Sequence, residues 1–431
     1  TPTGRGGIGV IRISGPLVPE IAHALLGQLP QPRYATLSDF VDSEGQLLDQ
    51  GIALYFPAPH SFTGEDVLEI QGHGGAIVMD LLLKALLKLG ACLARPGEFS
   101  ERAFLNGKID LAQAEAIADL IDSASAQAAR CAIRSLQGEF SAKINALVDQ
   151  LIWLRTYIEA GIDFVDEEID LLADGQVIEK LNNLMNDLDK TLDQAQQGYL
   201  LKEGMRIVLV GEPNVGKSSL LNHLAGRETA IVTPIPGTTR DVVRDQIQLD
   251  GMPLHITGAG LRETDDPVEQ EGIRRTKLAI KEADLVILLL DDRHHDDQEN
   301  ANLLVEWHQS PLIIRNKIDL SHHRAGMSAD GVLYLSAKTG EGIGLLKAYL
   351  KDKMGLHSST EGSFMARRRH LDSLQRTRNA FITALNHAQT DQSELLAEEL
   401  RQAQNALGEI TGKLTTDDLL GQIFSTFCVG K

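Results

Sequence analysis

The stretch GEPNVGKS at residues 211–218 decides the fold of the central part of this chain. It fits the phosphate-binding pattern G-x-x-x-x-G-K-[ST], in which glycines let backbone N–H groups curl around phosphates. The apolar run 207–210 before it is suited to a buried parallel strand, and an amphipathic helix is predicted to begin at Ser218. A chance glycine-rich turn is the alternative. Strand, loop and helix in this order instead favour a P-loop that binds a nucleoside triphosphate.

The side chains of this loop have defined chemical roles. Lys217 can place its ammonium on the β- and γ-phosphates, and the Ser218 hydroxyl can ligate Mg²⁺. The loop residues that we predict to bind nucleotide are Asn214, Val215, Gly216, Lys217, Ser218 and Ser219.

A second motif, NKID at residues 316–319, indicates which base is bound. The two carboxylate oxygens of Asp319 match the N1–H and N2–H₂ donors of guanine and not the adenine edge. Asn316 can brace the loop and approach the base, while the stem of Lys317 can cover its face. The motif follows a predicted strand at 312–314, and strands of open α/β sheets present ligand sites at their carboxyl ends.

A third element, SAK at residues 336–338, follows a predicted strand at 332–335 and could present a backbone N–H to guanine O6. Each short motif is weak alone, but in register after a P-loop they predict GTP. The base-side residues are Asn316, Lys317, Asp319, Ser336, Ala337 and Lys338.

The two predicted switch loops differ in how regular they are. IVTPIPGTTRD at 231–241 lies where the first switch belongs, and Thr239, or else Thr238, can meet Mg²⁺ when a γ-phosphate is present. In the second switch, TGAG at 257–260 lacks the aspartate of D-x-x-G. Gly260 can still offer its N–H to the γ-phosphate, but the outer partner of the metal is missing. Asp291 and Asp292 are poor substitutes because they follow a later strand.

The residue that orients the attacking water is also unusual. Leu261 stands where many GTPases carry a glutamine. Our candidate instead is Glu269, in a charged stretch that also contains Arg262. No arginine finger is evident. A monovalent cation could replace that charge, with Asn214 and carbonyls of the first switch as ligands.

Composition limits the class of protein. The chain has 431 residues, enough for about three domains, and 43% of them are hydrophobic. No apolar run approaches the ~18 residues of a membrane span, and three cysteines cannot build a disulfide framework, so we expect a cytoplasmic protein with no membrane contact. The first residues show no hydrophobic signal region. Residue 1 is a threonine and not the usual methionine, so we expect some residues to precede it.

The formal charge of −19 argues against a broad nucleic-acid-binding surface. If RNA is a substrate, a basic partner or a local patch such as RRRH at 367–370 should carry the phosphate contacts. For this patch we favour the simpler interpretation of a solvated helix start.

Hydrophobic periodicity divides the chain into segments. Residues 1–107 alternate as strands at 9–14 and 66–71, with a helix near 78–89. Three apolar stripes at helical spacing follow, the first assigned to one long helix. They are Ile133, Leu136, Phe140, Ile144, Leu147, Leu151, Leu154 and Ile158; Val177, Leu181, Leu184, Leu188 and Leu192; and Leu396, Leu400, Ala403, Leu407 and Ile410.

These stripes must be covered, so the helices before and after the P-loop segment are predicted to pack together. The fold class is therefore a multidomain α/β protein whose P-loop GTPase domain is inserted into an all-α helical domain, after an α+β amino-terminal domain. The predicted domains are 1–107, 108–202, 203–355 and 356–431, the last ending in Cys-Val-Gly-Lys.

Five further stretches make the chain recognisable: GRGGIG at 4–9, SFTGED at 61–66, QGHGG at 71–75, RPGEFSERAFLNGK at 95–108 and FCVGK at 427–431. With the GTP motifs, they resemble the MnmE/TrmE family of tRNA modification GTPases over nearly the whole length.

This resemblance implies a homodimer whose amino-terminal domain has a folate-binding fold. It implies a heterotetramer with a basic, FAD-dependent partner. The two proteins would add an aminomethyl or carboxymethylaminomethyl group to C5 of the wobble uridine of certain tRNAs. The carbon donor would be a tetrahydrofolate derivative, 5-formyl- or methylene-tetrahydrofolate. The rival function is a regulatory or ribosome-associated GTPase without modification chemistry.

The resemblance also assigns residues. It places the folate site at Arg12, Glu69, Lys108 and Lys431, K⁺ ligation at Asn214, Thr233, Ile235 and Thr238, and Mg²⁺ at Ser218 and Thr239. Glu269 matches the water-orienting acid of the family, in which potassium-dependent pairing of GTPase domains activates hydrolysis. The family carries Asp-Thr-Ala-Gly where this chain has 257–260. That departure puts full GTPase activity in question.

Other features are open or set aside. Arg12, Lys108 and Lys431 could meet folate carboxylates and Glu69 the pterin amino group, although each alone is interpretable as a surface charge. Cys428 is a candidate nucleophile, but packing is favoured. The G-x-G-x-x-G at 4–9 precedes its strand and is discarded. The His-Asp cluster at 294–297 and His322-His323 are interpreted as solvated loops rather than metal ligands.

Overall fold

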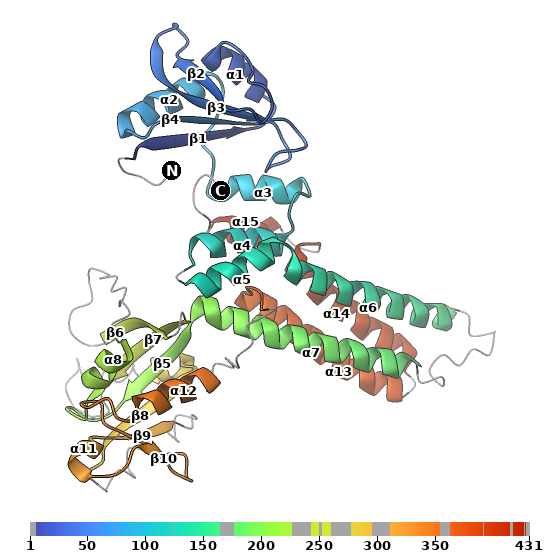
Figure 1. Ribbon diagram of the computed structural model, residues 1–431. Helices are drawn as coiled ribbons and strands as arrows, with labels where there is room; N and C mark the ends of the chain where they lie inside the picture. Colours follow the sequence, from blue (N-terminus) through green and yellow to red (C-terminus); the bar gives the residue numbers. More distant parts are fainter. Residues whose placement is uncertain are drawn as a thin grey trace. The chain divides into compact units, whose positions relative to one another are not determined.

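The computed structural model describes residues 6–123, 125–163, 176–225, 243–249, 252–259, 277–294, 311–353, 363–390, 392–413, 417–425 and 427 (Figure 1). The chain forms two compact units that are each discontinuous in sequence. One contains residues 1–118, 136–153 and 400–431, and the other contains residues 119–135 and 154–399.

The first unit begins with an antiparallel sheet of four strands in the order β1-β4-β3-β2. The strands are β1 (Ile8–Ser14), β2 (Thr36–Val41), β3 (Leu47–Phe56) and β4 (Val67–His73), and the helices are α1 (Val18–Leu26) and α2 (Ala76–Lys88). These elements confirm the predicted strands and helix. Both helices pack on one face of the sheet, against side chains such as Phe40 and Ile70. The opposite face carries Arg12, which is paired in register with Glu69.

Below the sheet, α3 (Glu98–Leu105), α4 (Leu111–Ile121) and α15 (Asp417–Ser425) are brought together by apolar contacts. Leu111, Phe424 and Phe427 are buried in one cluster. Gly97, with φ 70°, approaches Phe424 so closely that a Cβ would lie less than 3.0 Å from its carbonyl oxygen. The carboxyl-terminal helix is thereby fixed against the start of α3.

The first helical stripe departs from prediction, because it is divided between α5 (Ala126–Leu136) and α6 (Glu139–Asp163). The prediction of one long helix is wrong at Gly138, whose φ of 90° takes the left-handed conformation that ends helices. Gln113 donates to the carbonyl of Leu136 at 2.9 Å and satisfies one of the free acceptors at this end. Ile133 falls before the break and is 41% exposed.

The other two stripes are confirmed. All predicted positions on α7 (Gln176–Glu203) and α14 (Ser393–Thr411) are buried. Helix α13 (Arg368–Gln389) runs alongside α7 (Figure 1), and Arg378 pairs with Asp189 across them at 2.7 Å. Helices from before and after the nucleotide-binding segment therefore pack together.

Residues 367–370 do form a helix start, but they are not simply solvated, so that interpretation is corrected. Arg367 donates to Asp119 at 2.7 Å, and Lys202 lies 3.0 Å from the same carboxylate oxygen. His370 is buried and its Nδ1 accepts from the N–H of Arg367. The buried charge of Asp119 requires these partners, and sequence spacing gives no sign of it.

The sequence between α7 and α13 forms a sheet of seven strands in the order β10-β11-β9-β8-β5-β7-β6. They are β5 (Met205–Val210), β6 (Val243–Leu249), β7 (Met252–Ala259), β8 (Leu285–Asp291), β9 (Leu312–Asn316), β10 (Gly326–Met327) and β11 (Leu333–Leu335). The five central strands are parallel, and β6 and β10 are antiparallel at the edges. The helices are α8 (Lys217–Ala225), α11 (Ile318–Ser321) and α12 (Ile343–Lys353).

This sheet is the P-loop architecture that the motifs predict. The strands expected at 207–210, 312–314 and 332–335 are confirmed, and the phosphate loop joins β5 to α8. Its apolar core also includes Cys131 and Ala132 from α5, Leu201 from α7, and Met365. No helix in the described part of the chain is long and apolar enough to cross a bilayer.

Candidate functional site

The phosphate loop has the compact backbone that its sequence demands. Asn214 has a φ of 63° and Gly216 a φ of 108°, so the loop turns tightly before α8. The Lys217 ammonium donates to the carbonyls of Gly211 at 2.6 Å and Glu212 at 2.8 Å and so closes the loop on itself. Burial lowers the pKa of Lys217, an effect that the charge of Glu212 partly offsets.

Asn316 connects the phosphate side of the site to the base side. Its Nδ2 donates to the carbonyl of Val215 at 2.7 Å, and its Oδ1 accepts from the N–H of Ala337 at 2.8 Å. The residue is 2% exposed, so these bonds are shielded from water. The predicted bracing role of Asn316 is confirmed.

We call these two hydrogen bonds of Asn316 the Asn316 bracket, and Asp319 is held beside it. It belongs to the four-residue helix α11, and its Oδ1 accepts from the hydroxyl of Ser336 at 2.6 Å. Ser336 is fully buried and follows β11. The predicted base-side residues from β9 and β11 thus meet at the carboxyl edge of the sheet, where parallel strands end together.

Lys317 is anchored by a carboxylate from the neighbouring strand β8. Its Nζ donates to Asp291 Oδ2 at 2.8 Å, and Arg293 makes two further bonds to the same side chain at 3.0 and 2.7 Å. The bonds from Arg293 and then Lys317 outweigh burial and hold the pKa of Asp291 far below its usual range. Asp291 is therefore bonded to Lys317 and Arg293. Asp292 in turn contacts Ser321 and His323, so neither aspartate replaces the missing switch aspartate.

The irregular second switch continues a strand. Strand β7 runs through Thr257 to Ala259, and Thr257 pairs with Val208 of β5. The remaining predicted residues lie outside the described residues: Thr233, Ile235, Thr238, Thr239, Gly260, Arg262, Glu269, Cys428 and Lys431.

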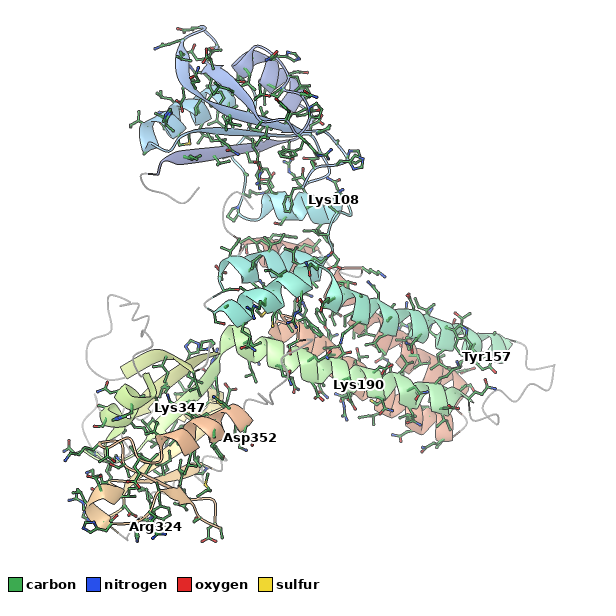
Figure 2. The ribbon with its side chains drawn as sticks, viewed as in Figure 1. Lys108, Tyr157, Lys190, Arg324, Lys347 and Asp352 are labelled. Carbon is green, nitrogen blue, oxygen red and sulfur yellow. The ribbon has the colours of Figure 1, made fainter. Side chains whose placement is uncertain are left out.

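In the amino-terminal sheet, two of the predicted folate residues bind each other. Arg12 donates to Glu69 at 2.7 Å across β1 and β4, and its guanidinium carbon lies 5.9 Å from the ring centroid of Phe99 on α3. The side chains of Arg12 and Glu69 are 30% and 17% exposed, respectively. Lys108, labelled near α3 in Figure 2, donates instead to the carbonyl of Pro59 at 2.9 Å.

Two distant stretches of sequence, 61–66 and 95–108, form one polar cluster that spacing alone did not reveal. Arg102 bridges Glu65 at 3.0 Å and Glu98 at 2.6 Å, and Asn106 donates to the carbonyl of Thr63 at 2.7 Å. Ser14 joins the same cluster through Glu65. The cluster fixes α3, and with it Phe99, beside the sheet face that carries Arg12.

Comparisons with known proteins show the family to which the chain is similar. Residues 1–108 match the GTP-binding protein TrmE N-terminus, and residues 111–428 match the MnmE helical domain. The tRNA modification GTPase MnmE of Pasteurella multocida (strain Pm70) is 57% identical over 445 residues, covering 100% of this chain and 98% of that protein. The MnmE of Haemophilus influenzae (strain PittEE) is 55% identical over 443 residues with the same coverage.

The chain belongs to the MnmE family of tRNA modification GTPases. Among solved structures, the G domain of the T. maritima FeoB iron transporter is 24% identical, with a TM-score of 0.28, and covers 36% of this chain and 99% of that one.

Within the MnmE framework, the described residues suit the ions and nucleotide that GTPases use. Ser218 is exposed at the start of α8 and Asn214 is exposed on the loop before it. Hydroxyl and amide oxygens are ligands that Mg²⁺ and other hard cations prefer. The backbone start of α8 also offers N–H groups to an anion.

His323 lies in an exposed loop, as the sequence predicts, and its side chain is 53% exposed. The structure adds a contact, because its Nδ1 lies 2.6 Å from Asp292 Oδ2. The ring also meets Tyr334 edge-on, with centroids 5.5 Å apart. Nothing in the local sequence signals this contact, because Asp292 lies 31 positions earlier.

Proposed function

We propose that this MnmE-family chain binds GTP with Mg²⁺, hydrolyses it, and uses the cycle in tRNA wobble-uridine modification. The observation that carries the GTP part is the Asn316 bracket. It ties the phosphate loop at Val215 to the base side at Ala337, with Asp319 alongside. A triphosphate on the loop and a guanine at Asp319 would thus be held by one connected structure.

On the base side, two protein groups have proposed partners on guanine. The carboxylate of Asp319 would accept from N1–H and N2–H₂. The N–H groups of Ser336, Ala337 and Thr339 are already bonded to protein acceptors. Within the described residues the N–H of Lys338 has no such partner, so we assign it to guanine O6.

On the phosphate side, Lys217 would exchange its bonds to loop carbonyls for the β- and γ-phosphates, and Ser218 would ligate Mg²⁺. We propose that Asn214 contributes an oxygen to K⁺, together with Thr233, Ile235 and Thr238. Thr239 would complete the Mg²⁺ site when the γ-phosphate is present. Glu269 would orient the attacking water, with Arg262 nearby in sequence.

Calorimetry of GTP and ATP, with an Asp319→Asn variant, tests the guanine site. Asparagine turns one acceptor into a donor, so one of the two hydrogen bonds is lost and the other is no longer made to a charged group. We therefore expect GTP affinity to fall by about 100-fold. XTP, whose oxygen replaces the 2-amino group, should gain affinity. Asp352→Asn makes the same change on the exposed end of α12 (Figure 2) and should leave GTP affinity intact. Equal binding of ATP and GTP by the unaltered chain would refute the site.

The chemical part of the proposal places a tetrahydrofolate derivative at Arg12, Glu69, Lys108 and Lys431. Supporting it, Arg12 lies beside Phe99 on the sheet face opposite to α1 and α2, and Gly97 two residues earlier approaches the carboxyl-terminal helix. Lys431 follows Phe427 by four residues, which span at most about 14 Å. A bound tetrahydrofolate would supply the one-carbon unit, and we propose a homodimer and an FAD-dependent partner for its transfer.

Mass spectrometry of wobble uridine, in cells that carry Arg12→Gln in place of the unaltered chain, tests the chemical part. We expect the C5 modification to fall sharply and binding of 5-formyltetrahydrofolate to weaken, while GTP affinity persists. If the wobble uridine keeps its modification in cells lacking this chain altogether, the function is that of a regulatory or ribosome-associated GTPase.

The hydrolysis step has its own test in Thr257→Asp, which restores the aspartate of the family motif. We expect faster GTP turnover, more so in K⁺ than in Na⁺. Unchanged turnover in both salts would mean that the second switch of this chain does not need that carboxylate.

A further inference from the structure

The helix that carries Asp319 is unusually short and is bounded on both sides by left-handed backbone. Lys317 before it has a φ of 72° and His322 after it has a φ of 60°. Residues other than glycine take this conformation only where surrounding contacts impose it. The direction of Asp319 therefore depends on what holds the two ends of α11.

Asp292 holds the far end. Its Oδ2 accepts from the hydroxyl of Ser321, the last residue of α11, and lies 2.6 Å from Nδ1 of His323. These two partners flank the left-handed His322. The N–H of Asp292 also donates to the carbonyl of Asn316 at 2.9 Å, before the near end. Asp292, which directly follows β8, thus contacts the segment on both sides of Asp319.

The Asp292 carboxylate is buried and only partly hydrogen-bonded. The Asp292 side chain is 1% exposed, and within the described residues its Oδ1 makes no hydrogen bond. The guanidinium of Arg315 is 3.9 Å from it. A buried charge that is only partly satisfied lowers stability. A destabilising group of this kind is expected where its other hydrogen bonds hold neighbouring residues in place, because charge-assisted hydrogen bonds are short and directional.

We infer that Asp292 is a positioning residue for guanine recognition, acting through Ser321 and His323 to set the direction of Asp319. Ser336 bonds Asp319 directly, whereas Asp292 acts on the segment that carries it. Asp291 anchors Lys317 in the same way, so the last residue of β8 and the residue after it fix the two ends of α11. This inference rests on the proposed guanine site.

The test compares GDP with IDP, which lacks the 2-amino group that Asp319 would bind. Calorimetry on the full chain gives the IDP-to-GDP ratio of dissociation constants for the unaltered protein, Asp292→Asn and Ser321→Ala. We expect that ratio to fall about fivefold or more in both variants, since a misdirected Asp319 loses the amino-group bond. Ser321→Thr keeps the hydroxyl and should restore the ratio. Asp330→Asn, on an exposed turn, should not change it.

A loosened domain without misdirection would weaken GDP and IDP equally. An unchanged ratio in Ser321→Ala and Asp292→Asn, with or without weaker binding, therefore overturns the inference. If Asp292→Asn does not fold, the Ser321→Ala and Ser321→Thr pair decides alone. If the unaltered chain itself shows no preference for GDP over IDP, the guanine site has failed, which is a separate result.

Discussion

At Gly216, the absence of a side chain lets Asn316 reach the phosphate loop. A Cβ at this position would lie under 3.0 Å from Asn316 Nδ2, and the φ of 108° also disfavours any other residue. The loop pattern predicts glycine here because the backbone must curl around the phosphates. The structure adds a second reason, which is contact with a side chain a hundred positions away.

Gly216→Ala should therefore break the bracket as well as strain the loop. We expect GDP affinity to fall by about 100-fold and the free energy of unfolding to fall by about 2 kcal/mol. Calorimetry and urea unfolding measure these. Gly344→Ala in α12 is the matched control, since nothing lies within 4 Å of its Cβ, and it should be neutral or slightly stabilising. Equal behaviour of the two variants would contradict this account.

Lys217 gives a pH dependence whose sign follows from its burial. Burial lowers the pKa of its ammonium in the free protein, whereas bound phosphates favour the charged form. Nucleotide binding should thus raise that pKa and take up a proton in the alkaline range below the ordinary lysine value of about 10.4. Calorimetry near that range, in buffers of different ionisation enthalpy, should detect the uptake. Nucleotide affinity should weaken as pH rises there. Absence of proton exchange would count against phosphate contact by Lys217.

Among elements, α7 depends on a close approach that its apolar stripe does not predict. Gly198 faces the carbonyl of Phe364 so closely that no Cβ fits between them. The segment 363–366 is buried and also bonds to α5, where Ser135 donates to the carbonyl of Met365 and Arg134 to that of Ser363. This segment connects α5 to α7 before α13 begins.

Gly198→Ala should push the segment away from α7. We expect the helical transition in urea, followed by far-ultraviolet circular dichroism, to lose about 3 kcal/mol. Gly421→Ala in α15 is the control, because its Cβ has open space, and it should lose little. A midpoint for Gly198→Ala equal to that of the control would show that the contact is not needed.

Elements with strong periodicity were predicted well, and their ends less so. The stripe of α14 and the alternation of β1 and β4 were read from local spacing, because each element buries one face. The break at Gly138 was missed, since apolar residues continue at helical spacing on both sides of it. What ends α5 is a backbone angle and a bond from Gln113, neither of which alters the apolar pattern.

At the scale of the whole molecule, the sheet and the helices share a core. Cys131, Leu201 and Met365 are buried together with strand residues such as Leu254. The predicted boundaries at 203 and 355 therefore stay a prediction, and they omit side chains that cover the sheet.

An isolated fragment 203–355 should be less stable than fragment 126–366, which keeps α5, α7 and Met365. Each large apolar side chain contributes about 2 kcal/mol when buried, so we expect a loss of a few kcal/mol in the shorter fragment. Hydrogen exchange of β5 and β7 amides, together with thermal unfolding, measures it. Matching stabilities would mean that the sheet needs no cover from the helical segments.

The P-loop, the guanine motif, the insertion of the GTPase domain into a helical domain and the family can all be predicted from the sequence, because these depend on residue types at short, fixed spacing. Three contacts are seen only in the folded chain: Asn316 bonds the phosphate loop, Arg12 pairs with Glu69, and Asp292 anchors α11. Each of these contacts joins residues from different strands or loops. Their pairing depends on strand order and register, which local spacing does not encode.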